Sequence, residues 1–155
     1  MCIDTLFEKY RGGKYMADSI QSKSEDIGKL ILRITIGGLL LFHGIFKLIH
    51  GVEWMKGPLS AFYLPGFLAY GVYIAEVIAP VLIIVGFWTR PAALIIAFDL
   101  FMAIVLVGRQ AIFTVKQAGG GWGIELEAFF LLGSFVLFFL GAGKYSITKG
   151  QGKWN

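Results

Sequence analysis

Four long hydrophobic runs, separated by shorter segments that hold most of the charges, dominate the pattern along this chain. They cover residues 30–49, 67–88, 91–107 and 125–141, and each is 17 to 22 residues long. About 20 residues of α-helix cross the hydrocarbon core of a bilayer. The runs are continuously apolar and lack the alternation of transmembrane β-strands, so helices are the remaining way to satisfy the backbone in lipid. We therefore expect an all-α fold, an integral membrane four-helix bundle.

The same pattern divides the chain into three parts. Residues 1–28 form a polar leader, which we expect to be a cytoplasmic tail that is helical in part at best. Residues 29–147 form the four-helix transmembrane domain, and residues 148–155 form a second short cytoplasmic tail. The first hydrophobic run is too long for the apolar region of a signal peptide, so the leader is not expected to be cleaved.

The amino-acid composition excludes several classes of protein and of site. Hydrophobic residues make up 57% of the chain and charged residues only 15%, where soluble domains have about 25% charged residues. This balance excludes disorder and a nucleic-acid-binding domain built on basic patches. The single cysteine, Cys2, excludes a disulfide framework and a cysteine-based zinc site within the chain. We expect Cys2 to be a free thiol.

Basic residues are divided unevenly between the two sides that four spans create. Three lie on the side away from the termini: Lys56, Arg109 and Lys116. Nine lie on the side of the termini: Lys9, Arg11, Lys14, Lys23, Lys29, Arg90, Lys144, Lys149 and Lys153. An excess of Lys and Arg marks the cytoplasmic side of a membrane protein. We therefore expect both termini in the cytoplasm.

Several ionisable side chains fall inside the hydrophobic runs or at their edges. They are Arg33, His43, Lys47, Glu76, Asp99, Glu125 and Glu127. Such a group near the bilayer centre costs at least about 2.5–3.5 kcal/mol, so it usually faces the bundle interior and has a partner. These seven residues are therefore the candidates for a site.

Depth along the helices brings most of the candidates together. With a rise of about 1.5 Å per residue, His43 and Lys47 lie about 5 and 11 Å above the middle of the first helix. Glu76 lies about 2 Å above the middle of the second, and Glu125 and Glu127 about 9–12 Å above that of the fourth. We expect a Lys47–Glu76 ion pair. It either fixes only how two helices dock, or belongs to an acid/base cluster of His43, Lys47 and Glu76 that handles protons beside a bound organic ligand.

The remaining candidates are assigned to cofactor binding: Arg33, Asp99, Glu125 and Glu127. Arg33 lies about 10 Å below the midplane, and its alternative role is to extend to the inner surface with its charge in water. Asp99 lies close to the midplane and has no cation at its own depth. We expect no metal site, because His43 and His50 are seven residues and two helical turns apart.

Five short motifs in order resemble one known family, DoxX. The first two cover residues 32–37 and 42–48. The third is residues 85–90, which close the predicted helix that carries Glu76, and the last two are residues 123–126 and 141–147. DoxX proteins are small four-helix inner-membrane proteins and include the DoxD-like subunit of thiosulfate:quinone oxidoreductase. The resemblance covers residues 29–147. The closing motif departs from the family pattern, with Ala142 for proline, Lys144 for arginine and Thr148 for aspartate.

The resemblance implies a multi-pass protein of the cell (inner) membrane that serves as a subunit of a quinone-dependent oxidoreductase. Quinone is then the implied cofactor, and none is expected to be covalently bound. The expected partners are the lipid bilayer and either a soluble redox protein or a second membrane subunit, with a homo-oligomer as a further alternative. A non-catalytic anchor or assembly subunit and, less favoured, a small proton-coupled transporter are the competing functions. The chain shows no internal repeat that would support the transporter.

Overall fold

The computed structural model describes residues 2–116 and 119–155, with side chains from residue 21 onward, so the side chain of Cys2 lies outside the described part. Every element in this part is helical, which confirms the all-α prediction. The elements in chain order are α1 (Cys2–His50), η1 (Glu53–Met55), α2 (Lys56–Ala61), η2 (Gly66–Tyr70), α3 (Gly71–Tyr73), η3 (Ile74–Ile78), α4 (Ala79–Val85), α5 (Thr89–Leu106), η4 (Gly108–Ala111) and α6 (Glu125–Leu140).

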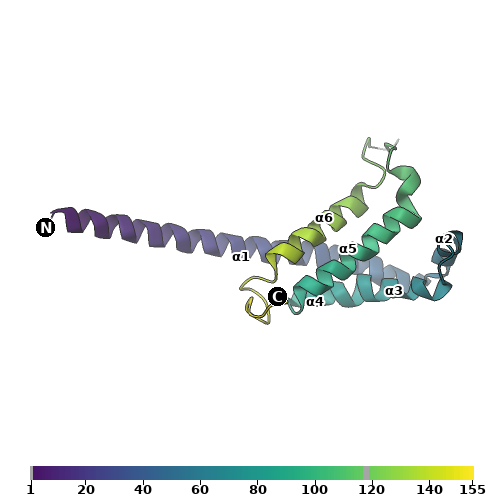
Figure 1. Cartoon of the computed structure of the whole chain (residues 1–155), viewed down its shortest axis with the longest axis horizontal. Coiled ribbons are helices and arrows are strands. Elements are labelled where there is room, and N and C mark those ends of the chain that lie inside the picture. Colours follow the sequence, from purple (N-terminus) through teal and green to yellow (C-terminus); the bar gives the residue numbers. More distant parts are fainter. Residues whose placement is uncertain (1, 117–118) are drawn as a thin grey trace.

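Helix α1 is one continuous helix that includes the leader. Its first half extends away from the other helices, and its second half lies in the bundle (Figure 1). The expectation that the leader is helical in part at best is therefore wrong. Adding one residue to an existing helix is far easier than nucleating a new one. The leader contains no proline, the residue that breaks a helix interior most strongly, so the helix of the first hydrophobic run can continue through it.

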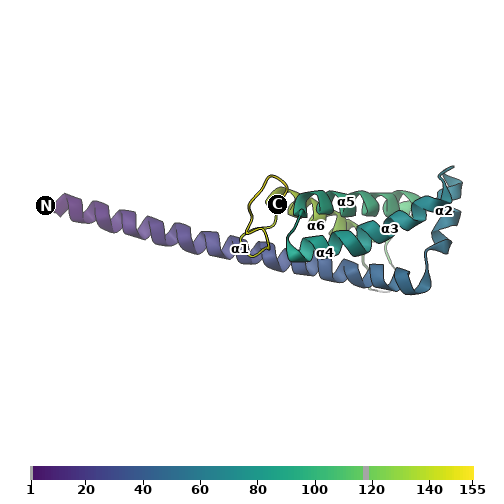
Figure 2. The same cartoon turned by 90° about the horizontal axis from the view of Figure 1, so that it is seen from below.

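Within the described part of the chain, three helical stretches are long and apolar enough to cross a membrane: Gln21–His50, Gly66–Val85 and Thr89–Leu106. The second stretch joins η2, α3, η3 and α4 into one rod beside α1 and α5. The fourth predicted run becomes α6, which packs against α5 and α1 (Figure 2). The four predicted runs thus correspond to helices, although α6 has only 16 residues, and its role as a fourth span stays a prediction.

A tight hairpin joins α4 to α5. Gly86 ends α4 in the left-handed conformation (φ 73°), and the N–H groups of Gly86 and Phe87 bond back to the carbonyl of Leu82. Glycine adopts this conformation without a Cβ penalty, which explains why the rod stops at Val85 and not at Trp88 as predicted. Helix α5 begins at Thr89, two residues before Pro91, which needs no N–H partner in a first turn.

Small residues set the distances between the helices. A Cβ on Gly37 would lie 2.7 Å from the Ile84 side chain, and one on Gly44 would collide with the backbone carbonyl of Glu76. Four alanines of the second and third runs are also buried: Ala75, Ala79, Ala93 and Ala97. Close helix approach at small residues is typical of membrane bundles, and it brings the backbones of α1, η3 and α4 together.

The connection between α1 and η2 is folded back on the bundle. Val52 and Leu59 are 1% and 4% exposed and form a small core with Ala69 and Val72. Leu106, at the end of α5, packs on the same cluster. The connection therefore covers the end of the bundle opposite the protruding half of α1.

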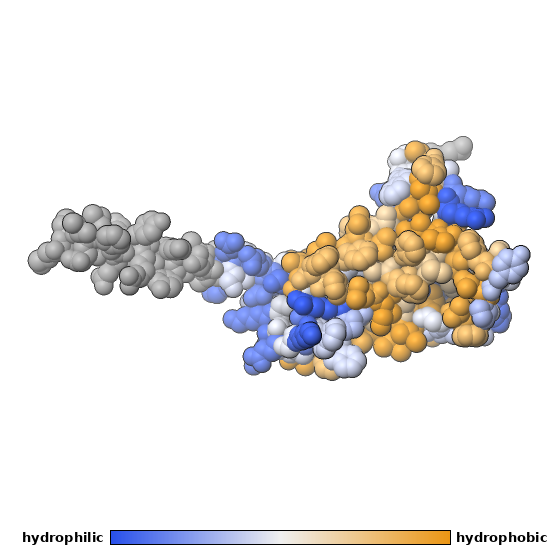
Figure 3. All heavy atoms as spheres, viewed as in Figure 1, coloured by the Kyte–Doolittle hydropathy of each residue, from blue (hydrophilic) through white to orange (hydrophobic). Residues whose placement is uncertain are grey.

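On the face of the bundle seen in Figure 3, the surface between the two polar ends is apolar. Large side chains such as Phe42, Phe98 and Phe139 are 73%, 67% and 73% exposed. A soluble monomer rarely exposes a large contiguous apolar surface, whereas a lipid-facing bundle requires one. The apolar helices and this surface together place the protein in a lipid bilayer.

Candidate functional site

A cavity of about 640 Å³ lies inside the half of the bundle that the connection covers. Its walls come from α1, the connection, the η2–η3 rod, α5 and α6. They are mainly apolar, with Leu40, Met55, Leu59, Met102 and Phe130 among the lining residues. The cavity also contains five of the seven predicted site residues: His43, Lys47, Glu76, Asp99 and Glu127. The structure thus brings most of the predicted cluster together around one space.

The predicted ion pair between Lys47 and Glu76 is present. Lys47 Nζ donates to Glu76 Oε1 at 2.5 Å, and the two side chains are 18% and 6% exposed. The hydroxyl of Tyr73 also donates to the backbone carbonyl of Lys47 at 3.3 Å. The other carboxylate oxygen, Glu76 Oε2, is buried and has no hydrogen-bond partner among the described residues. The ion pair therefore uses one oxygen of the carboxylate and leaves the other oxygen unbonded within the described part of the chain.

The backbone at Glu76 explains why this carboxylate reaches the cavity. Residues Ile74–Ile78 form a π-helical turn, in which the N–H of Ala79 bonds to Ile74. Pro80 follows, and it has no N–H to donate to the Glu76 carbonyl four residues earlier. Gly44 makes room for that carbonyl on α1. Single π-turns are frequent at functional sites, and this one positions Glu76 opposite Lys47.

Other polar groups surround the ion pair. His43 lies edge-on to Phe130, with ring centroids 6.0 Å apart. Asp99 lines the cavity from α5, and Glu127 lines it from the first turn of α6 with its Oε2 buried and unbonded. The cavity therefore contains three carboxyl groups, one ammonium group and one imidazole. This set can hold and exchange protons.

The cavity extends to the lipid-facing surface between η3 and α5. Ile74, Ile95 and Phe98 line it and are also exposed on the outside of the bundle, by 51%, 40% and 67%. An apolar molecule dissolved in the bilayer would meet only apolar side chains at this edge. The Lys47–Glu76 pair is less exposed, at 18% and 6%, so the site suits a ligand with an apolar body and a polar head.

Arg33, a predicted cofactor-binding residue, lies outside this cavity. It is 1% exposed, so its charge does not extend to the surface. Its guanidinium donates at 2.6–2.8 Å to the carbonyls of Ile83, Ile84, Ala142 and Tyr145. Arg33 thus caps the end of α4 and attaches the segment that follows α6, and the structure gives it a packing role away from the site.

Glu125 also lies outside the cavity and is exposed, although it is only two residues from Glu127. At about 100° per residue, positions two apart face directions about 200° apart on a helix. Only one of the two can face the cavity, and that residue is Glu127.

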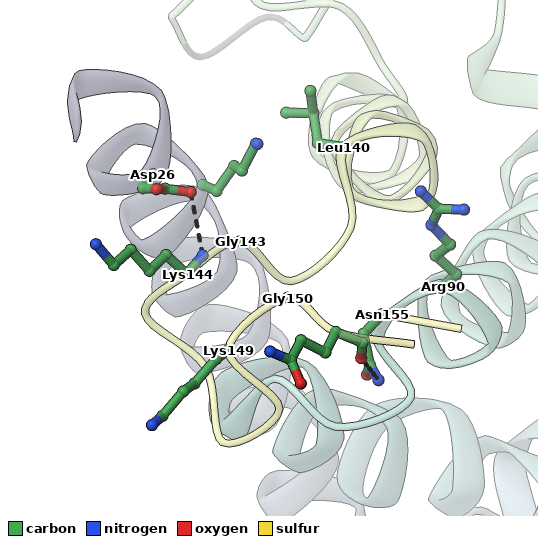
Figure 4. A pocket seen from close by; sticks show the side chains of 10 residues that line it. Asp26, Arg90, Leu140, Gly143, Lys144, Lys149, Gly150 and Asn155 are labelled. Carbon is green, nitrogen blue, oxygen red and sulfur yellow. Dashed lines mark hydrogen bonds between the residues drawn. The ribbon is translucent and has the colours of Figure 1, made fainter. Parts of the chain in front are cut away.

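A second hollow, of about 570 Å³, lies at the other end of the bundle beside the segment after α6. It is polar and shallow, and Lys144 and Lys149 extend away from it (Figure 4). The backbone N–H of Lys144 bonds to Asp26 at 3.1 Å, which ties the segment to α1. None of the predicted site residues lines this hollow, so the apolar cavity is the candidate site.

Sequence reasoning missed two features of the site. Pro80 is a visible signal for a disturbed helix next to Glu76, but it does not show which turn widens. Trp54 and Met55, on the connection, line the cavity, and their only signal is that this connection is too apolar to lie in water. Among the described residues, no group of three or more His, Cys, Asp and Glu side chains is placed to hold a metal ion.

One further ion pair lies on the connection, outside the site. Lys56 Nζ contacts Glu53 Oε2 at 2.5 Å, and the Tyr70 hydroxyl donates to Glu53 Oε1 at 3.2 Å. The hydrogen bond from Lys56 and then that from Tyr70 lower the pKa of the exposed Glu53 carboxyl below its usual value. This exposed pair provides a comparison for the buried pair in the cavity.

Comparisons with known proteins agree with the resemblance seen in the motifs. The DoxX family model matches residues 28–109, which include His43, Lys47, Glu76 and Asp99. A protein of Bacillus subtilis (strain 168) named "Putative oxidoreductase CatD" is 35% identical over 92 residues, which are 59% of this chain and 68% of that protein. No solved structure matches the chain. The chain belongs to the DoxX family and is a multi-pass membrane protein.

Proposed function

We propose that this protein is a membrane subunit of a quinone-linked oxidoreductase system, and that its cavity holds the quinone head group. One observation carries the proposal: an apolar cavity that reaches the lipid-facing surface contains a buried lysine–glutamate pair and further acidic groups. A quinone has an apolar tail and a head group that gains or loses protons, so both parts find a matching environment. The oxidoreductase name of the Bacillus subtilis relative agrees with this class of function.

The cavity residues have a defined task in this proposal. Reduction of a quinone to a quinol takes up two electrons and two protons, and oxidation releases them. His43, Asp99 and Glu127 are positioned to supply or accept the protons. Lys47 and Glu76 orient the head group through the ammonium and the free carboxylate oxygen. The electrons pass between the ring and a partner redox protein or a soluble substrate.

We further propose that the protein lies in the cell (inner) membrane with both termini in the cytoplasm. The nine-to-three distribution of basic residues supports this orientation. The cavity then lies in the outer half of the membrane, below the connection between α1 and η2.

The test is whether quinone stays with the protein through its cavity. Gly71 lines the cavity and has open space at its Cβ position, so Gly71→Leu adds bulk at the cavity wall without a clash at Cβ. Gly38→Leu is the matched control, because Gly38 also has open space but does not line the cavity. Both proteins are purified in mild detergent beside the wild type, and quinone is measured against phospholipid in extracted lipids.

We expect wild type and Gly38→Leu to retain quinone above the ratio of the parent membrane, and Gly71→Leu to lose most of this excess. Equal ratios in all three proteins and the membrane would contradict the proposal. Co-purification with a redox enzyme but no quinone enrichment would support the anchor or assembly role instead. The packing role of Arg33 shows that buried charge in this fold also serves structure alone.

A further inference from the structure

Two residues that line the cavity each have a buried carboxylate oxygen without a hydrogen-bond partner in the described part of the chain: Glu76 Oε2 and Glu127 Oε2. Buried polar atoms are nearly always bonded, and an exception in a native structure points to a missing partner. Both oxygens belong to residues that line the same cavity. The missing partner is therefore expected inside the cavity.

The ion pair decides what kind of partner Glu76 needs. Lys47 Nζ lies 2.5 Å from Oε1, a contact that holds Glu76 as a carboxylate facing an ammonium group. An ionised carboxylate only accepts hydrogen bonds. Glu76 is 5% exposed, so bulk water does not reach it freely. Oε2 therefore requires a hydrogen-bond donor from whatever occupies the cavity.

The two redox forms of a quinone differ in this respect. The ring oxygens of the oxidised form are carbonyls and only accept hydrogen bonds, whereas the reduced form has two phenolic hydroxyl groups that donate. Building on the proposed function, we infer that the cavity binds the quinol more tightly than the quinone, with a phenolic hydroxyl donating to Glu76 Oε2. Glu127 lines the same cavity, and its unbonded carboxylate oxygen is a second candidate acceptor for the head group.

The preference has an electrochemical consequence. A site that binds the reduced form more tightly makes the bound quinone easier to reduce than quinone in the surrounding lipid. For a two-electron couple, each tenfold difference in affinity raises the midpoint potential by about 30 mV. The cavity would thus favour transfer of electrons from a donor onto the bound ring.

The experiment compares the two redox forms directly. Decylubiquinone and decylubiquinol are titrated into full-length protein in mild detergent under nitrogen, and binding is followed by calorimetry. A hydrogen bond to a charged group corresponds to about tenfold or more in affinity. We expect wild type to bind the quinol at least about tenfold more tightly. In Glu76→Gln the ratio should fall towards one, because an amide can also donate to a quinone carbonyl.

Glu53→Gln is the matched control, since Glu53 also pairs with a lysine at 2.5 Å but is exposed and lies outside the cavity. It should keep the wild-type ratio. The wild-type ratio is decisive even if Glu76→Gln fails to fold. Equal affinities, or tighter quinone binding, in wild type would overturn the inference and leave the proposed function standing. Binding of neither form would overturn both.

Discussion

The Lys47–Glu76 pair gives the sharpest prediction about stability, because its two members differ in burial. Lys47→Met leaves a carboxylate that is 6% exposed and has no remaining partner on either oxygen among the described residues. Glu76→Gln leaves an ammonium group that is 18% exposed and faces an amide oxygen. Breaking a buried pair costs about 3–5 kcal/mol. We expect Lys47→Met near the upper end of this range and Glu76→Gln near the lower end.

The double variant should recover part of these losses, because it leaves no unpaired charge. Coupled neighbours typically show interaction energies of about 0.5–3 kcal/mol, and the low exposure of both side chains, 18% and 6%, places this pair in the upper part of that range. For a chain of this size, each kcal/mol corresponds to roughly 2–4 °C in melting temperature. The single variants should therefore melt roughly 6–20 °C lower than wild type, with the double variant clearly above the worse single variant.

Thermal unfolding in detergent measures all four proteins. The exposed Glu53–Lys56 pair is the comparison, and its removal should not measurably change the melting temperature. Strictly additive losses at Lys47 and Glu76 would refute the reasoning, because they would mean that the two side chains do not interact. If the pair also serves the ligand, the double variant should regain stability without regaining quinone binding. Recovery of both would reduce the pair to a role in helix docking.

Three further predictions test the fold around the site. Gly44→Ala should destabilise the protein strongly, because its Cβ would collide with the Glu76 carbonyl, whereas Gly38→Ala, with open space at that position, should melt close to wild type. Arg33→Met should leave four carbonyls without their donor and lower the free energy of unfolding by at least about 3 kcal/mol. It should also speed tryptic cleavage at Lys144, and unchanged cleavage would show that Arg33 does not hold the segment after α6. Reporter fusions after Asn155 and within residues 112–116 should report opposite compartments, and the same compartment for both would rule out four spans.

The Lys47–Glu76 contact could be predicted because helix geometry converts sequence position into depth. Both residues lie on long helices joined by a short connection, and both fall above the middle of their hydrophobic runs. Neither charge can stay unpaired in lipid without a large cost. Depth and charge together therefore select this pair, which the structure confirms at 2.5 Å.

The surroundings of Arg33 could not be predicted in the same way. Its partners lie at the end of α4, about 50 residues away, and on a segment more than 100 residues away. That segment returns to the bundle after Gly141, which has φ 72°. No local pattern shows that a polar stretch after a helix folds back to meet a buried arginine. A long-range contact of backbone carbonyls has no side-chain signature in the sequence.

The prediction for Glu125 differs from the structure because of the face of α6 on which this residue lies. Glu125 and Glu127 were both expected at the site, yet only Glu127 lines the cavity. The rotation of α6 about its axis is set by its packing on α5 and α1, and Phe130 is the buried residue that fixes it near the cavity. The sequence shows that the two carboxylates point apart, but choosing between them needs the packed neighbour.

The continuity of α1 has a mechanical consequence. A straight helix from Cys2 to His50 is about 74 Å long at 1.5 Å per residue, more than twice the roughly 30 Å of a hydrocarbon core. The protruding half of α1 and the part of α1 that carries His43 and Lys47 in the cavity wall belong to the same helix, which contains no proline that could act as a hinge. If α1 tilts by only 5° about the point where it enters the bundle, its N-terminal end, about 40 Å away, moves by roughly 3–4 Å. A force applied to the N-terminal end of α1 is therefore transmitted along this helix to the cavity wall.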